Sequence, residues 1–112
     1  MDSTRQNKIS RLVQKELSEV FQREVREIVK GTMVSVTSVK VTPDLAIAKS
    51  YLSIFPGEHK NDVFASIKAA SGQIRYLLGQ RVGKQLRVIP ELQFYIDDSL
   101  DYLDNIDRLL KE

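Results

Sequence analysis

The chain has 112 residues, of which 42% are hydrophobic and 29% charged, as in an ordinary globular domain. It contains no cysteine, which excludes disulfides, thiol catalysis and cysteine-based zinc sites. The longest uninterrupted apolar run is the four residues 45–48, whereas a membrane helix needs roughly 20. We therefore expect a single domain over residues 1–112, without a membrane span or a secretory signal, located in the cytoplasm.

The net charge of +2 hides an asymmetry along the chain. Residues 1–90 carry 15 Lys and Arg against 8 Asp and Glu, a balance of +7, whereas residues 91–112 carry 2 against 7, a balance of −5. A basic body is typical of proteins that bind polyanions, because each neutralised phosphate releases condensed counterions. The alternative is a solvated surface on which charges cluster by chance.

A first helix is predicted between Ile9 and Val29, where apolar residues recur at steps of three and four. At 100° per residue, the later apolar positions turn away from the earlier ones, so one straight helix cannot bury them all. We expect the helix to bend or end before Gly31, with Ser3 as its N-cap. Three basic residues lie near its first half: Lys8, Arg11 and Lys15.

A β-hairpin is predicted next, because two runs rich in β-branched residues flank the turn pair Pro43-Asp44. The two strands are expected over residues 34–41 and 45–55. Small residues share one side of the second strand, which favours close packing of a helix there: Ala46, Ala48 and Ser50.

A second helical pattern covers residues 63–82, with Asn61 or Asp62 as its cap. Three glycines interrupt it: Gly72, Gly79 and Gly83. Because an interior glycine costs a helix roughly 1 kcal/mol relative to alanine, we expect two helices that meet at a kink. The alternative is that the glycines only permit tight packing against the sheet. The predicted kink comprises Ala70, Ser71 and Gly72.

A third strand is predicted over residues 87–96, where apolar and polar side chains alternate. Pro90 has no backbone N–H, so we expect this strand at a sheet edge or with a bulge. Residues 98–112 carry the pattern of a final short helix with acidic residues in its first turn. The order α-β-β-α-α-β-α predicts an α+β fold with a three-stranded sheet.

The sequence offers no catalytic constellation. His59 is the only histidine, so one chain can build neither a histidine-based triad nor a multi-histidine metal site. Asp97, Asp101 and Asp104 could face a hard cation from one side of a helix, but an acidic solvated face is the better interpretation. We predict no enzyme activity, no catalytic residue, no metal site and no cofactor.

Several short motifs resemble the ribosome-binding factor A family, whose members have a type II KH-like domain. They occupy residues 42–49, 69–75, 77–79, 90–94 and 97–100, and the match extends from about Lys8 to Leu110. Most KH domains clamp nucleic acid with a GxxG loop, whereas Ala70-Ser71-Gly72 is similar to this family's Ala-x-Gly kink. Glu27-Ile28-Val29 replaces the family's frequent Asp-Pro-Arg, so we expect a different exit from the first helix.

The resemblance implies a non-catalytic maturation factor of the small ribosomal subunit. Such a factor binds the free small subunit through its 16S rRNA, assists late assembly and processing of the rRNA 5′ end, and supports growth in the cold. Other small-subunit assembly factors are further partners that the resemblance implies, and we expect a monomer.

Charge and helical spacing select the candidate rRNA contacts. Lys68 and Arg75 are seven residues apart, which places them on one helical face if the kink is mild. Arginine can fork onto phosphate oxygens, so Arg75 and Arg87 are the stronger individual candidates. Gly72 is interpreted as bending the backbone so that the following helix presents its basic face. The full set is Lys8, Arg11, Lys15, Lys68, Arg75, Arg81, Lys84 and Arg87.

Two alternatives remain open. One is a KH-like module that binds single-stranded RNA or DNA, for which Tyr76 is the only stacking candidate near the kink. The other is a protein-interaction domain that uses an exposed edge strand.

Overall fold

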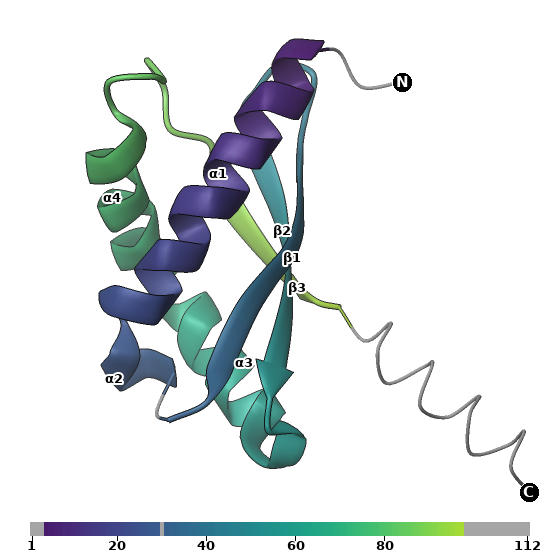
Figure 1. The fold of residues 1–112 in the computed structure, drawn as a ribbon, viewed down its shortest axis with the longest axis vertical. Helices are drawn as coiled ribbons and strands as arrows, with labels where there is room; N and C mark the ends of the chain where they lie inside the picture. The colour runs from purple at the N-terminus through teal and green to yellow at the C-terminus, as the bar shows by residue number, and fades with distance from the viewer. Residues whose placement is uncertain (1–3, 30, 98–112) are drawn as a thin grey trace, which may run out of the picture.

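A three-stranded sheet with helices on one of its faces forms the domain (Figure 1). A computed structural model describes residues 4–29 and 31–97. The predicted Ser3 cap and the predicted helix over residues 98–112 lie outside the described residues. In chain order the elements are α1 (Thr4–Arg23), α2 (Arg26–Val29), β1 (Met33–Val41), β2 (Ile47–Phe55), the 3-10 turn η1 (Gly57–His59), α3 (Lys60–Ala69), α4 (Ser71–Val82) and β3 (Glu91–Ile96).

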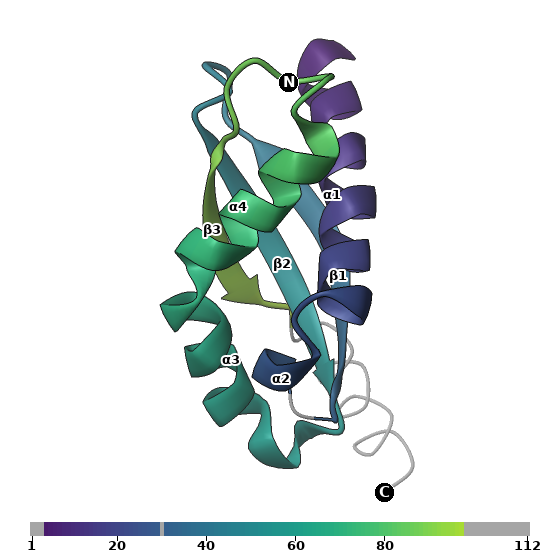
Figure 2. The same ribbon diagram turned by 90° about the vertical axis from the view of Figure 1, so that its left-hand side faces the viewer.

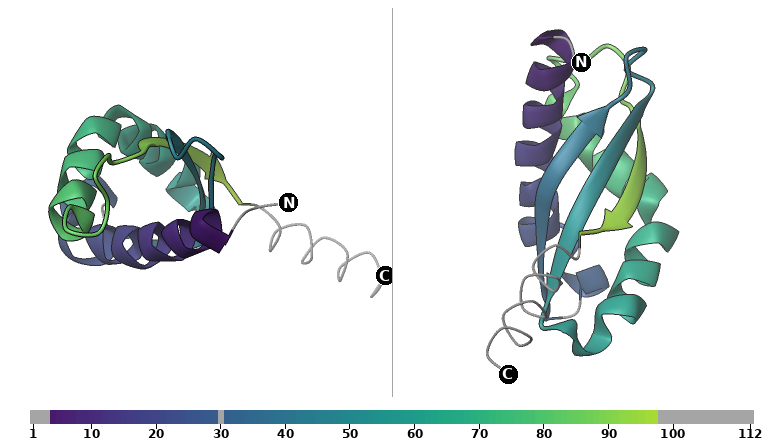
Figure 3. Two further views of the ribbon diagram at one scale, coloured as in Figure 1. Left: turned by 90° about the horizontal axis from the view of Figure 1, so that it is seen from above. Right: turned by 90° about the vertical axis from the view of Figure 1, so that its right-hand side faces the viewer.

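The sheet has the order β1-β2-β3, with β1 and β2 antiparallel and β2 and β3 parallel. A parallel neighbour requires a crossover, which α3 and α4 supply. Figure 2 looks onto the helices, and the right panel of Figure 3 looks onto the opposite face of the sheet. The predicted edge position of the third strand is confirmed, because β3 is the last strand of the sheet.

The core lies between the helices and the inner face of the sheet. Val13 and Leu17 of α1 and Leu78 of α4 are fully buried there, and the rings of Phe21 and Phe94 meet edge to face at 6.1 Å. The small-residue side of β2 is buried as predicted at its strand positions, Ala48 and Ser50. Ala46 precedes the strand and is exposed, because β2 begins at Ile47 rather than Leu45.

The predicted bend in the first helical segment is confirmed. α1 ends at Arg23 and α2 begins at Arg26, so the chain changes direction around the buried Val25. Glu27-Ile28-Val29 lie in the short helix α2, which forms the exit from α1 in this chain.

The predicted kink between two helices is also confirmed, but its cause is corrected. Ala70, with φ −95° and ψ 13°, separates α3 from α4, whereas Gly72 lies inside α4. Apart from its chain neighbours and the nearby backbone of its own helix, a Cβ atom at Gly72 would meet no described atom within 4 Å, so the bend does not require this glycine. At Gly79 the close-packing alternative applies, because a Cβ atom would lie 3.3 Å from Ile89 Cγ1.

Two further predicted boundaries are wrong. His59 is the N-cap of α3, so Asn61 and Asp62 lie inside the first turn instead of capping it. β3 begins at Glu91 and not at residue 87, because residues 83–90 form the loop that carries the chain from α4 back to the sheet. Apart from these boundaries, the observed order and sheet confirm an α+β, type II KH-like fold.

Candidate nucleic-acid interface

A stripe of basic residues runs along the solvent side of α1. Lys8, Arg11 and Lys15 are exposed, and Ile9 and Val13 point into the core from the other side of the helix. The sequence analysis missed Arg5, which is also exposed. Its three-residue spacing from Lys8 was the available clue, since all four cations fall within an arc of about 120° on the helix.

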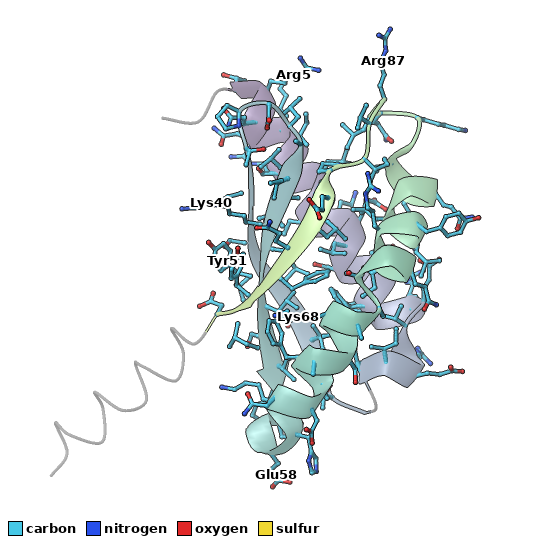
Figure 4. The ribbon with its side chains drawn as sticks, turned by 180° about the vertical axis from the view of Figure 1, so that it is seen from behind. Arg5, Lys40, Tyr51, Glu58, Lys68 and Arg87 are labelled. Carbon is cyan, nitrogen blue, oxygen red and sulfur yellow. The ribbon has the colours of Figure 1, made fainter. Side chains whose placement is uncertain are left out.

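The loop from α4 to β3 brings further cations to the end of the molecule where α1 begins. Arg5 and Lys8 line one wall of a cleft of about 700 Å³, and Arg87 lines another. Figure 4 shows Arg5 and Arg87 projecting at this same end. Lys84 is exposed one residue before Gln85, which also lines the cleft.

Six exposed cations therefore form what we call the basic surface: Arg5, Lys8, Arg11, Lys15, Lys84 and Arg87. Within residues 4–29 and 31–97, none of the six forms an ion pair. Within this part of the chain, therefore, no carboxylate neutralises their positive charge through an ion pair.

The turn between β1 and β2 contributes one carboxylate to the cleft. Asp44 Oδ1 accepts hydrogen bonds from the Thr42 hydroxyl at 2.6 Å and from the Ala46 amide at 3.2 Å. The hydroxyl of Thr42, and then the amide of Ala46, lower the pKa of Asp44 below its ordinary value. Leu45, which lies between Asp44 and Ala46 in the chain, adopts a φ of 61°, a left-handed conformation that leucine rarely takes.

Arg81 is a predicted contact that the structure uses internally. Its guanidinium lies 3.0 Å from Glu19, 3.3 Å from Glu16 and 3.4 Å from Glu24, and so joins α4 to α1. Partial burial opposes its charge, but the three carboxylates outweigh that effect and raise the pKa of Arg81. Its charge is compensated, unlike the charges of the basic surface.

Arg75 also forms hydrogen bonds within the chain. Its guanidinium donates to the carbonyl of Ile89 at 2.6 Å and to that of Pro90 at 3.2 Å. These bonds fix the loop that carries Lys84 and Arg87. Arg75 itself is exposed, and these two hydrogen bonds join α4 to the end of that loop.

Lys68 lies apart from the basic surface, on α3 beside the kink (Figure 4). Its ammonium group is 5.5 Å from the centroid of the Phe64 ring. A hollow of about 250 Å³ separates this helix from β3, lined by Lys68, Ser71 and residues 92–95. Of the predicted cations, Lys68 is the one that lines this hollow, so most of the positive charge lies elsewhere.

The sheet face opposite the helices carries an aromatic pair that the sequence analysis did not single out. Tyr51 and Tyr95 are register partners on β2 and β3, and their rings stack with centroids 5.4 Å apart. Lys40, labelled in Figure 4, is exposed on this face. Its partner across β1 and β2 is Lys49, which is exposed as well. The alternation along β2 was the clue to this surface.

Neither a metal cluster nor a membrane helix is found in the described part of the chain. No group of three His, Cys, Asp or Glu side chains in residues 4–29 and 31–97 could hold a metal ion. Over the same residues, no helix combines the length and apolar character needed to cross a bilayer.

Comparison with known proteins gives one family. The model of the family "Ribosome-binding factor A" matches residues 5–110. Ribosome-binding factor A of Cytophaga hutchinsonii is 43% identical over 112 residues, which covers 100% of this chain and 84% of that protein. The corresponding protein of Flavobacterium johnsoniae is 46% identical over 111 residues, covering 98% and 85% of the two chains.

Solved structures show the same fold at lower identity. The crystal structure of ribosome-binding factor A from Thermus thermophilus matches with a TM-score of 0.67 and 19% identity, over 81% of this chain and 94% of that one. A Thermus thermophilus ribosome-binding factor A model fitted into a cryo-EM map of a 30S complex matches with a TM-score of 0.60 and 19% identity, over 78% and 89%.

Proposed function

The chain belongs to the ribosome-binding factor A family, and from this premise we propose that it binds the free small ribosomal subunit. The family name and the 30S complex of a Thermus thermophilus relative support this partner. The observation that carries the proposal is the basic surface, whose six exposed cations have no ion-pair partner among the described residues.

The basic surface binds rRNA through its phosphates. Phosphate contacts fix the position and orientation of a protein on folded RNA, and they release counterions that make binding depend on salt. If each of the six cations contacts one phosphate, the logarithm of the binding constant falls with the logarithm of salt concentration with a slope of about −5. Arg75 supports this surface by holding the loop of Lys84 and Arg87.

The action on the subunit is non-catalytic. A protein that binds one rRNA conformation more tightly than another shifts the population toward the first by the difference in binding free energy. In this way the protein assists late assembly of the small subunit and processing of the 16S rRNA 5′ end, and supports growth in the cold. It acts as a monomer in the cytoplasm, alongside other small-subunit assembly factors.

The geometry favours this function over the two alternatives. The hollow beside the kink, where a KH-like module would hold a single strand, is lined by Lys68 alone among the predicted cations. A protein-interaction domain that uses the edge strand β3 does not account for the six cations of the basic surface, which have no ion-pair partner among the described residues. Binding by such a protein-interaction domain would also depend little on salt concentration.

Co-sedimentation tests the proposal. The purified protein is mixed with free small subunits, free large subunits or assembled ribosomes at rising salt concentrations. We expect salt-sensitive binding to free small subunits alone, and a loss of about tenfold in affinity for the double variant Lys8→Glu, Arg11→Glu.

The matched control is the double variant Lys40→Glu, Lys49→Glu. It makes the same change of charge on the open face of the sheet, away from the basic surface. Equal losses in both variants would show that net charge, and not the basic surface, controls binding. Equal binding of the unaltered protein to all three particles would contradict the choice of partner.

A further inference from the structure

The cleft at the basic end has the size and walls of a small-ligand site. Its volume of about 700 Å³ lies within the range of roughly 300–1,000 Å³ found for ligand clefts. Three separate segments enclose it: the start of α1, the turn from β1 to β2, and the loop from α4 to β3. Apolar side chains from these segments line it, among them Ile9, Leu45, Leu86 and Val88.

Val88 is the clearest sign that this apolar surface lacks an internal partner. Its side chain is 71% exposed although it lines the cleft with Leu86 and Pro90. A valine held in this position gains little from folding, but it offers an apolar contact to an occupant of the cleft.

The charges at the cleft favour an anionic occupant. Arg5, Lys8 and Arg87 supply three positive charges and Asp44 supplies one negative charge, so the lining carries +2. Asp44 is bound within its own turn through Thr42 and Ala46. The three cations, by contrast, have no ion-pair partner among the described residues.

The walls of the cleft are held in place from two sides. Leu45 keeps its left-handed backbone, with φ 61°, because the hydrogen bonds of Asp44 close the turn around it. Arg75 fixes the carbonyls of Ile89 and Pro90 at the end of the loop that carries Leu86, Arg87 and Val88. Backbone strain maintained in this manner recurs at ligand-binding sites.

We propose that this cleft holds one unpaired rRNA nucleotide, with its base against Leu45, Leu86 and Val88 and its flanking phosphates on Arg5, Lys8 and Arg87. A nucleotide joins a flat base, whose faces are apolar and whose edges are polar, to anionic phosphates. The base faces match the apolar walls, and the phosphates match the basic rim. A base within an RNA duplex cannot enter, because its faces are stacked and the major groove is deep and narrow. The inference rests on the proposed function, since it names the part of the rRNA that the basic surface binds.

Binding of a short RNA tests the cleft directly. Fluorescence anisotropy compares a single-stranded hexanucleotide with the same sugar-phosphate strand lacking its bases, and with a duplex of the hexanucleotide. We expect the intact strand to bind at least fivefold more tightly than the abasic strand and the duplex. The variant Val88→Asn should remove this preference and leave binding of the abasic strand unchanged.

The control variant is Met33→Asn, which makes the same kind of change at a residue that is 67% exposed at the far end of β1. Equal binding of the intact and abasic strands would overturn the proposal that the cleft holds a base. Phosphate binding by the basic surface would not be contradicted by that result. Binding of small subunits but of no oligonucleotide would also overturn the proposal for the cleft. A preference for bases that Val88→Asn abolishes supports the cleft even if small subunits fail to co-sediment, a result that would overturn the proposed function alone.

Discussion

The Arg81 guanidinium donates a hydrogen bond to Glu19 Oε2 at 3.0 Å, joining two helices across 62 positions of sequence. Glu16 and Glu24 bind the same guanidinium at 3.3 and 3.4 Å. The second half of α1 is thus tied to α4 by charge, while Arg5, Lys8 and Arg11 in its first half are exposed and have no ion-pair partner among the described residues. In α1, therefore, the carboxylates of the second half stabilise the packing against α4, and the cations of the first half are the ones we propose to bind RNA.

Replacing Arg81 should destabilise the domain without weakening its hold on RNA. In the variant Arg81→Gln three carboxylates face one another without their cation, so we expect the melting temperature to fall by several degrees. Co-sedimentation with small subunits should remain unchanged at a temperature where the variant is folded. Lys84→Gln is the matched control, because it should weaken co-sedimentation and leave the melting temperature unchanged. Weaker binding by folded Arg81→Gln would return this residue to the set of RNA contacts.

Arg75 should act through the loop and not through its charge. Arg75→Lys keeps a positive charge but cannot make both hydrogen bonds to the carbonyls of Ile89 and Pro90. We expect a loss of about 1 kcal/mol in the free energy of unfolding, measured by urea denaturation, together with an affinity for small subunits about threefold lower. Restored affinity in Arg75→Lys, with lost affinity in Arg75→Gln, would instead identify Arg75 as a direct phosphate contact.

Gly72→Ala should preserve the kink, since the break occurs at Ala70 and a Cβ atom at position 72 meets no described atom within 4 Å. Because alanine favours helix more than glycine does, the free energy of unfolding should rise by up to about 1 kcal/mol. Binding to small subunits should not change. Gly79→Ala is the contrasting variant: its Cβ would lie 3.3 Å from Ile89 Cγ1, so part of the gain should be lost to crowding. Straightening of the junction in Gly72→Ala, seen by NMR, would contradict the assignment to Ala70.

Hydrophobic periodicity was enough to predict most of the fold, because it reflects local geometry. The period of the apolar residues identified the bend before Gly31, and the interrupting glycines pointed to the kink, which the structure places at Ala70. It failed at residues 87–90, where alternation resembles a strand. There, α4 holds the chain through the Arg75 bonds to Ile89 and Pro90.

The candidate site was harder to predict because sequence spacing treats all cations alike. What separates Arg81 from Lys84 is a set of carboxylates on α1 and directly after it, up to 65 positions away in the chain. Arg5 and Arg87 line the same cleft only because α4 and its loop fold back over the start of α1. Such long-range contacts depend on the tertiary fold, and the spacing of residues within one helix cannot predict them.

Asp44 should give the stability of the domain a pH-dependent component. Its folded-state pKa is lowered by the Thr42 hydroxyl and then by the Ala46 amide, so the ionised form stabilises the turn. This stabilisation is complete above the ordinary pKa of 3.8 and is lost as the pH falls through the lower folded-state value. Asp44→Asn keeps an acceptor oxygen but removes the charge, so it should be less stable than the unaltered protein at neutral pH.

Urea midpoints of the two proteins at about pH 7 and about pH 2.5 measure this component. The difference between the two urea midpoints should be present at neutral pH and smaller at about pH 2.5. Thr42→Ala serves as a second probe, because it removes the hydroxyl that lowers the pKa of Asp44 most. The double variant Thr42→Ala, Asp44→Asn should lose less stability than the sum of the losses in the two single variants, since both changes affect the same hydrogen bond. A difference that stays constant with pH would show that the charge of Asp44 does not stabilise the turn.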